Sequence, residues 1–192
     1  MKEAIKMSET HPILKNYALF GIIFTFVMGS LFHFIYDLSG SATLVGYFFP
    51  INESVWEHLK LGFYTWLVYG ISNYFFLNDK VNNYWIGIFF ATLAMNLFII
   101  IFFYTYTGIF GHSILALDIG SYLVGCIVAA YVYYRILVLP PISTYGHTMG
   151  LLLLLLNIVL FAMWTYHPPK LPLFEDPTTH PAVVTSFSST TL

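Results

Sequence analysis

Histidine and carboxylate side chains are spaced along this sequence in a way that could build a metal site. Both are ligands of Zn²⁺, which in catalytic sites keeps one position open for water. The candidate ligands are His33, Asp37, His58, His112 and Asp118. His33 and Asp37 are four residues apart, which places them on one face of a helix, where they could also simply hydrogen-bond. The sequence does not fix a cofactor, but such a site could hold a divalent metal such as zinc.

Glu53 and Glu57 could supply the proton transfer that such a site needs for hydrolysis. A bound Zn²⁺ lowers the pKa of its water to about 7, which makes hydroxide available. Either glutamate could act as the general base, since both lie close to His58 in the sequence. The sequence contains no H-E-x-x-H or comparable ligand pair, so no motif specifies this chemistry.

Asp118 is the clearest polar residue inside an apolar segment. An ionisable side chain within a membrane span costs about 2.5–3.5 kcal/mol on insertion scales, so it usually faces protein and often marks function. At 1.5 Å per residue, Asp118 lies about 8 Å below the start of its predicted helix. It could instead serve packing through a hydrogen bond to Tyr122 or to a neighbouring helix.

Four further side chains are candidates for ligand binding: Asn52, Trp56, Lys60 and Tyr122. Trp56 with Lys60 also fits an interfacial anchor, in which the lysine reaches toward the headgroups. Ser54 and Glu57 fit a capping box, in which the glutamate satisfies the start of a helix.

Five long apolar segments must position these side chains. A spanning helix needs about 20 mostly apolar residues, and lipid tolerates no unpaired backbone groups, which favours helices over open strands. The predicted helices are Tyr17–Tyr36, Ser54–Leu77, Tyr84–Tyr104, Ser113–Leu137 and Gly146–Tyr166. The expected fold is therefore an all-α polytopic membrane bundle of about five transmembrane helices.

The composition agrees with a multi-pass membrane protein. Hydrophobic residues make up 58% of the 192-residue chain and charged residues only 8%, whereas soluble domains carry about 25% charged residues. A net charge of −2 offers no basic surface for nucleic acid, and the single Cys126 excludes an internal disulfide. The lipid bilayer is the expected partner. The domain organisation predicted is a polar cytoplasmic N-terminus (1–16), a transmembrane domain (17–166), and a proline-rich then Ser/Thr-rich tail (167–192).

Basic residues predict the orientation, because they favour the cytoplasmic side. With five spans, the N-terminal side carries Lys2, Lys6, Lys15, Lys80 and Arg135, and the other side carries only Lys60 and Lys170. We therefore expect the N-terminus inside and the C-terminus outside. Most of the histidines and acids then fall at the outer face. We predict an outward-facing pocket that contains His58, Glu57 and at least one of His33, Asp37, His112 and Asp118.

Two sequence blocks resemble the hallmarks of a family of small uncharacterised bacterial multi-pass membrane proteins. Residues 50–60 read PINESVWEHLK, and residues 166–177 read YHPPKLPLFEDP. The resemblance extends over about Tyr17 to Pro177, and the sequence departs from it beyond that point. The family has no assigned activity, so the resemblance implies a fold, a motif and a plasma-membrane location, but no substrate.

Three functions are compatible with these observations. A binding or scaffold protein that contacts a lipid ligand or a membrane-protein partner is favoured, because no diagnostic catalytic signature is present. The alternative is a metal-assisted hydrolase acting on a lipid or lipid-linked substrate at the outer leaflet. A proton or metal-ion transporter is the third, and it would require a polar path through the membrane.

Overall fold

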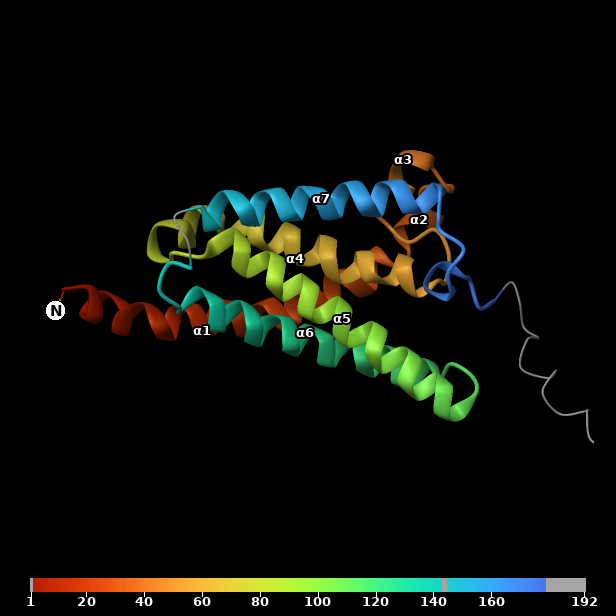
Figure 1. The fold of residues 1–192 in the computed structure, drawn as a ribbon, viewed down its shortest axis with the longest axis horizontal. Coiled ribbons are helices and arrows are strands. Elements are labelled where there is room, and N and C mark those ends of the chain that lie inside the picture. The colour runs from red at the N-terminus through yellow and green to blue at the C-terminus, as the bar shows by residue number, and fades with distance from the viewer. Residues whose placement is uncertain (1, 143–144, 179–192) are drawn as a thin grey trace, which may run out of the picture.

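The computed structural model describes residues 2–142 and 145–178, and over these residues the fold is all-α (Figure 1). The long helices are α1 (Lys2–Phe32), α4 (Val55–Leu77), α5 (Tyr84–Phe110), α6 (Leu115–Leu137) and α7 (Gly146–Tyr166). The short elements are α2 (Ile35–Leu38), α3 (Thr43–Gly46) and the 3₁₀ turns η1 (Asn78–Lys80) and η2 (Pro172–Phe174). The predicted all-α class is confirmed. The Ser/Thr-rich end of the predicted tail lies outside the described residues.

Four helices are long and apolar enough to cross a membrane: α1 over His11–Phe32, α5, α6 and α7. Helix α4 has 23 residues, as many as α6, but its sequence is not apolar enough to make it a candidate membrane span. Its N-terminal half carries Glu57, His58 and Lys60 and is mostly buried against other parts of the protein. Polar residues are tolerated there because they face protein groups instead of lipid. The five-span arrangement therefore stays a prediction.

Helix α5 contacts α4, α6 and α7, and helix α1 contacts α4 and α6. The core between them is aromatic and apolar, with Trp66, Met95, Cys126 and Tyr133 fully buried. Gly150 on α7 permits one close helix crossing, because a Cβ atom there would lie 2.3 Å from the backbone nitrogen of Ile86.

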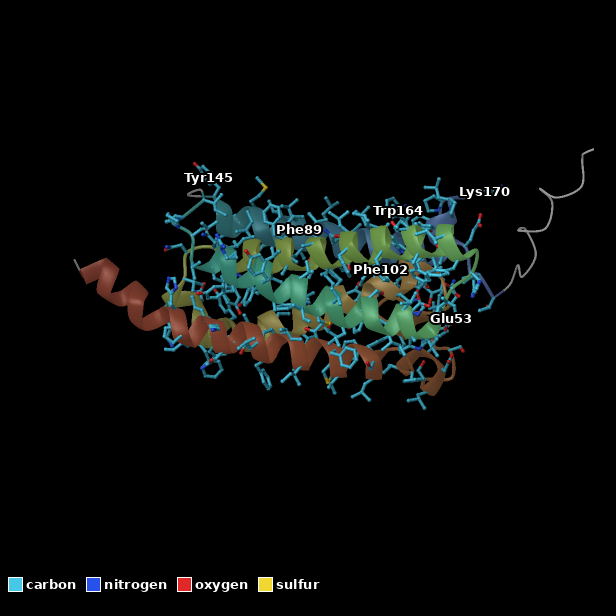
Figure 2. All side chains as sticks on the ribbon, turned by 90° about the horizontal axis from the view of Figure 1, so that it is seen from below. Glu53, Phe89, Phe102, Tyr145, Trp164 and Lys170 are labelled. Carbon is cyan, nitrogen blue, oxygen red and sulfur yellow. The ribbon has the colours of Figure 1, made fainter. Side chains whose placement is uncertain are left out.

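Large apolar side chains cover the outside of the bundle. Phe75 is 85% exposed, Ile109 73% and Val159 58%. Figure 2 shows mostly carbon atoms on the side chains that point outward between the two ends. Soluble monomers rarely expose continuous apolar surface of this extent, so this surface is suited to lipid.

Helix α1 differs from its predicted limits at both ends. It begins at Lys2, within the segment expected to be a polar extension, and it ends at Phe32 instead of Tyr36. At Phe34 the backbone N–H bonds to the carbonyl of Leu31, a tighter i−3 turn that breaks the helix. Asp37 therefore belongs to α2, and the predicted common helical face for His33 and Asp37 is wrong.

Helix α5 is longer than predicted and ends where Gly111 adopts a left-handed conformation with φ of 77°, which glycine accepts without steric cost. Figure 1 shows this end of the α5–α6 hairpin directed away from the start of α4. The candidate site lies where the α5–α6 hairpin and the start of α4 separate.

Candidate functional site

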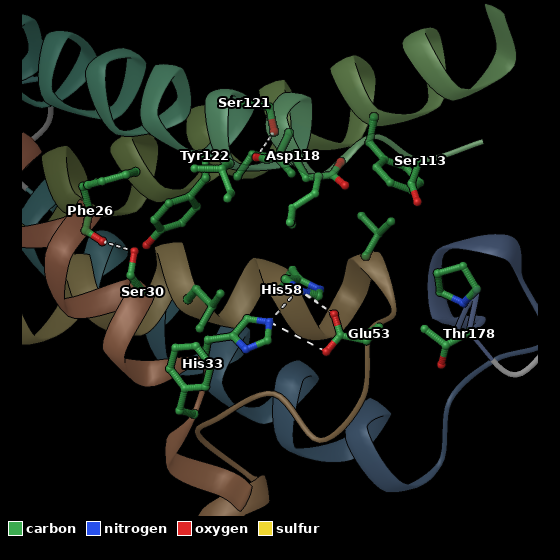
Figure 3. Close-up of a pocket in the computed structure, with 18 residues that line it drawn as sticks. Phe26, Ser30, His33, Glu53, His58, Ser113, Asp118, Ser121, Tyr122 and Thr178 are labelled. Atoms are coloured by element: carbon green, nitrogen blue, oxygen red, sulfur yellow. Dashed lines mark hydrogen bonds and ion pairs between the residues drawn. The ribbon is translucent and has the colours of Figure 1, made fainter. Parts of the chain in front are cut away.

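Two histidines and one glutamate converge at the start of α4 (Figure 3). The Nε2 atoms of His33 and His58 are 3.1 Å apart. Glu53 Oε2 lies 3.4 Å from His58 Nε2, and Glu53 Oε1 lies 3.7 Å from His33 Nε2. One ligand atom from each residue fits within 4.8 Å of the others. We call His33, Glu53 and His58 the His/Glu cluster.

The sequence around the start of α4 fixes two members of this cluster. Ser54 is the N-cap, and its side chain accepts a hydrogen bond of 3.3 Å from Glu57 N–H, as the capping prediction requires. Asn52 Oδ1 accepts from Ser54 N–H at 3.0 Å, which forms a local turn that places Glu53 at its outer edge. Asn52 therefore supports the loop beside the site.

His58 is oriented by its own helix. Its Nδ1 atom lies 2.9 Å from the carbonyl oxygen of Ser54. A carbonyl oxygen can only accept, so Nδ1 carries the proton. In the neutral ring, Nε2 then has its lone pair directed toward His33 and Glu53. Metal-binding histidines are commonly oriented in this way by a backbone carbonyl.

The proline-rich tail docks onto the same region. Phe174 in η2 packs against Trp56 and Trp164, with ring centroids 4.9 and 5.7 Å apart. Glu53 N–H donates to Asp176 Oδ2 at 3.3 Å. Burial alone would raise the pKa of Asp176, but hydrogen bonds from Thr178 and Glu53 and the proximity of His58 lower it below its ordinary value. The tail thus holds the loop that carries Glu53.

A cavity of about 610 Å³ adjoins the His/Glu cluster. Its polar part includes all three cluster residues, and Asp118 on α6 lies across the cavity from them (Figure 3). Its apolar walls come from α1, α4, α5 and α6, and include Phe26, Leu61, Ile99, Phe103, Leu115 and Ile119. Pro177 and Thr178 of the tail form another part of the wall. The cavity therefore joins ionisable groups to an apolar compartment.

Asp118 is held by the neighbouring helix. The phenol of Tyr106 on α5 donates to its Oδ1. The hydroxyl of Tyr122 instead donates to the carbonyl oxygen of Thr25 on α1, at 3.0 Å. The contact expected between Asp118 and a neighbouring helix is therefore present, whereas Tyr122 lines the cavity without bonding to Asp118.

The predicted ligands divide into two groups. His33, His58 and Asp118 line the cavity, and Asp37 and His112 do not. Asp37 is exposed on α2, because α1 ends before it. His112 is exposed in the α5–α6 turn, where its Nδ1 donates to the carbonyl oxygen of Phe110 at 3.0 Å. Glu53, predicted as a base, lies instead within reach of both cluster histidines.

Glu57 and Lys60 belong to a separate buried network, and the prediction that Glu57 shares the pocket is wrong. Their side chains are 2.7 Å apart and almost completely buried. Glu57 also accepts from Ile51 N–H at 3.0 Å and from the Thr165 hydroxyl at 3.2 Å, and Lys60 donates to Gly46 O at 2.8 Å. The pair satisfies the backbone N–H of Ile51 and the carbonyl oxygen of Gly46, which both precede α4. The predicted snorkelling of Lys60 and a ligand-binding role for it are therefore not supported by its position.

Trp56 serves packing instead of lining the cavity. It contacts Phe161 and Trp164 on α7 and Phe174 in the tail, with ring centroids 4.7–5.1 Å apart. Sequence reasoning identified this tryptophan as an interfacial anchor, but its aromatic partners depend on tertiary packing. It joins α4, α7 and the tail beside the His/Glu cluster.

These observations define a small helical protein with an apolar exterior, several helices suited to membrane spanning, and an ionisable cavity near one end. The chain belongs to the family described as "Family of unknown function (DUF6512)", which matches residues 6–181. The resemblance to an uncharacterised family is thus supported over most of the chain. No curated protein and no solved structure matches it.

Proposed function

We propose that this chain is an integral membrane protein that binds a divalent transition metal such as zinc at the His/Glu cluster. The observation that carries the proposal is the convergence of His33, Glu53 and His58 within 4.8 Å. If the chain has five spans, most of its basic residues lie on the N-terminal side of the membrane, opposite the site. This bias supports a cytoplasmic N-terminus and an outward-facing site in a plasma membrane.

The spacing of the cluster agrees with zinc coordination. Ligands about 2.05 Å from zinc at a tetrahedral angle are ~3.3 Å apart. The observed separations are 3.1 Å between His33 and His58 and 3.4 Å between His58 and Glu53. The distance of 3.7 Å between His33 and Glu53 involves the other carboxylate oxygen, so a small rotation of Glu53 would complete the set.

Three protein ligands next to a cavity leave a fourth position for water or a ligand. This is the pattern of catalytic zinc sites, which keep one position open, and not of structural sites, which are closed by four protein ligands. The hydrogen bond from His58 Nδ1 to Ser54 supplies the orienting contact from outside the ligand set.

The test is metal content and affinity of the purified full chain, measured by elemental mass spectrometry and competition titration with zinc. We expect about one zinc ion per wild-type chain, and an affinity at least tenfold lower in His33→Ala, Glu53→Ala and His58→Ala. His112→Ala is the matched control, because His112 is exposed and outside the cavity. Equal zinc binding by the His58 and His112 variants, or none by folded wild type, would refute the site.

A binding or scaffold role without metal is the second candidate. It is favoured by the packing of Trp56 on Phe174 and Trp164, which gives the protein an ordered cap at the same end. Under this function, His58→Ala would leave partner or lipid binding intact. A transport function receives less support, since Trp66, Met95 and Cys126 fill the bundle interior with apolar groups.

A further inference from the structure

We propose that the cavity hydrolyses the ester or amide bond of an acyl-chain amphiphile, with Asp118 as the general base. This inference rests on the proposed metal site, because the metal would hold and acidify the attacking water. It adds a substrate class and a catalytic residue, and both follow from the shape and lining of the cavity.

The cavity lies where an amphiphile would place its polar and apolar parts. His33 follows the last residue of α1, and Glu53 precedes the first turn of α4, so the cluster lies at the level of the helix ends. Phe26 lies on α1 seven residues before His33, which places it about 10 Å further from the end of the bundle that carries the cluster. A molecule with its polar group at the cluster would therefore extend its chain toward the middle of the bundle.

The wall of the cavity continues onto the lipid-facing surface. Phe34 is 58% exposed, Leu115 74% and Ile119 52%, although all three line the cavity. An acyl chain could enter sideways from the bilayer between the end of α1 and the start of α6. This access favours a membrane amphiphile over a water-soluble metabolite.

Asp118 is the carboxylate that we assign to exchange a proton with water in the cavity. It faces the cluster across the cavity from another helix (Figure 3). Tyr106 donates to its Oδ1, which fixes the carboxylate while its second oxygen makes no hydrogen bond within the described residues. A general base needs this combination of fixed position and available lone pair.

The reaction balances with water as the only co-reactant. Water at the His/Glu cluster would transfer a proton to Asp118, and its oxygen would form a bond to the acyl carbon. The bond from that carbon to the alcohol oxygen or amine nitrogen then breaks, and the leaving group takes the proton from Asp118. The products are a carboxylic acid and an alcohol or amine.

The test uses the zinc-loaded full chain in mixed micelles with 4-nitrophenyl dodecanoate as the probe and 4-nitrophenyl acetate as the probe without a long chain. We expect dodecanoate to be hydrolysed with at least tenfold higher kcat/KM than acetate, because only its chain fills the apolar walls. Asp118→Asn should lower kcat by about 100-fold or more while retaining zinc. Asp37→Asn, which changes an exposed aspartate outside the cavity, is the matched control.

Tyr106→Phe keeps the test valid if Asp118→Asn does not fold. It removes the hydroxyl that donates to Asp118 and accepts from the Ile114 N–H, and we expect kcat to fall with zinc content unchanged. A zinc-loaded wild type that hydrolyses neither ester would overturn the hydrolase and leave the metal site standing. Absence of zinc would refute the proposed function itself. Full activity in both the Asp118 and Tyr106 variants would overturn the assignment of the base.

Discussion

Lys60 Nζ lies 2.7 Å from Glu57 Oε2 inside the bundle, where the lysine side chain is 0% exposed and the glutamate 2%. The two charges are three residues apart on α4 and are stabilised from opposite sides. Ile51 and Thr165 donate to Glu57, and Lys60 donates to the carbonyl oxygen of Gly46. The pair therefore joins the loop before α4 and helix α7 to α4.

Replacing Lys60 by Met should strongly destabilise the protein, by about 3–5 kcal/mol, because it leaves the buried Glu57 carboxylate without its partner. The measurement is unfolding by a denaturing detergent, followed by loss of helical circular dichroism. Lys80→Met, at an exposed lysine in η1, should cause no measurable change. The double variant Glu57→Gln/Lys60→Met should be more stable than Lys60→Met alone. A double variant that is less stable would show that the two residues act independently.

A second prediction concerns the crossing of α7 and α5. A Cβ atom at Gly150 would lie 2.3 Å from Ile86 N and 2.6 Å from the carbonyl carbon of Trp85, which are backbone atoms that cannot move without shifting α5. Gly150→Ala should therefore lower the melting temperature in detergent, as overpacking costs about 1–3 kcal/mol. Gly120→Ala on α6 meets nothing within 4 Å and should be neutral or slightly stabilising. Equal effects of the two substitutions would contradict this helix crossing.

The helices could be predicted from the sequence because their signal is local. Long apolar runs located α5, α6 and α7, and the Ser54 cap is confirmed by its hydrogen bond to Glu57 N–H. The side chain of Glu57 does not complete a capping box, since Ser54 N–H bonds to Asn52 and the carboxylate turns toward Lys60. A buried partner overrides the local pattern here.

The site was less predictable because it depends on contacts between distant residues. His33 and His58 are 25 residues apart in sequence, and their meeting follows from the break in α1 at Phe34, which no proline or glycine marks. The part played by Glu53 depends on the tail, 123 residues away. Periodicity indicates which residues share a helix face, but it contains no information on such pairings.

A third prediction tests the docking of the tail by pH and mutation. The interactions of Asp176 lower its pKa below the ordinary value of 3.8. They therefore stabilise the docked tail at pH values above 3.8. This stabilisation is lost as the pH falls through the lowered pKa of the folded state. Asp176→Ala should lower zinc affinity about tenfold at neutral pH, because Glu53 loses the acceptor of its N–H. The neighbouring Glu175→Ala is the control, with wild-type affinity expected. An Asp176 variant that binds zinc as wild type does would show that the tail does not support the site.

The fourth prediction concerns the membrane orientation, which determines the leaflet that the cavity faces. Helix α4 lies alongside α1 and α5 in the bundle, so if those helices cross the bilayer, α4 crosses with them. With the orientation predicted from the basic residues, Asn82 would then be at the cytoplasmic end and Lys170 at the outer end. Cys126 is fully buried, so we expect little labelling of the wild-type chain by a cysteine reagent.

We expect a membrane-impermeant maleimide added to intact cells to label Lys170→Cys, and to label Asn82→Cys only after the membrane is opened. Both positions are exposed in the structure, so a difference between them reports sidedness and not burial. The reverse pattern would place the cavity at the cytoplasmic leaflet and would leave its chemistry unchanged. An odd number of spans places the two positions on opposite sides of the membrane. Labelling of both positions from outside would therefore contradict the crossing of the membrane by α5, α6 and α7 as three successive helices. Because the five-to-two bias of basic residues predicts the first pattern, this comparison tests the orientation and the odd number of spans between the two positions.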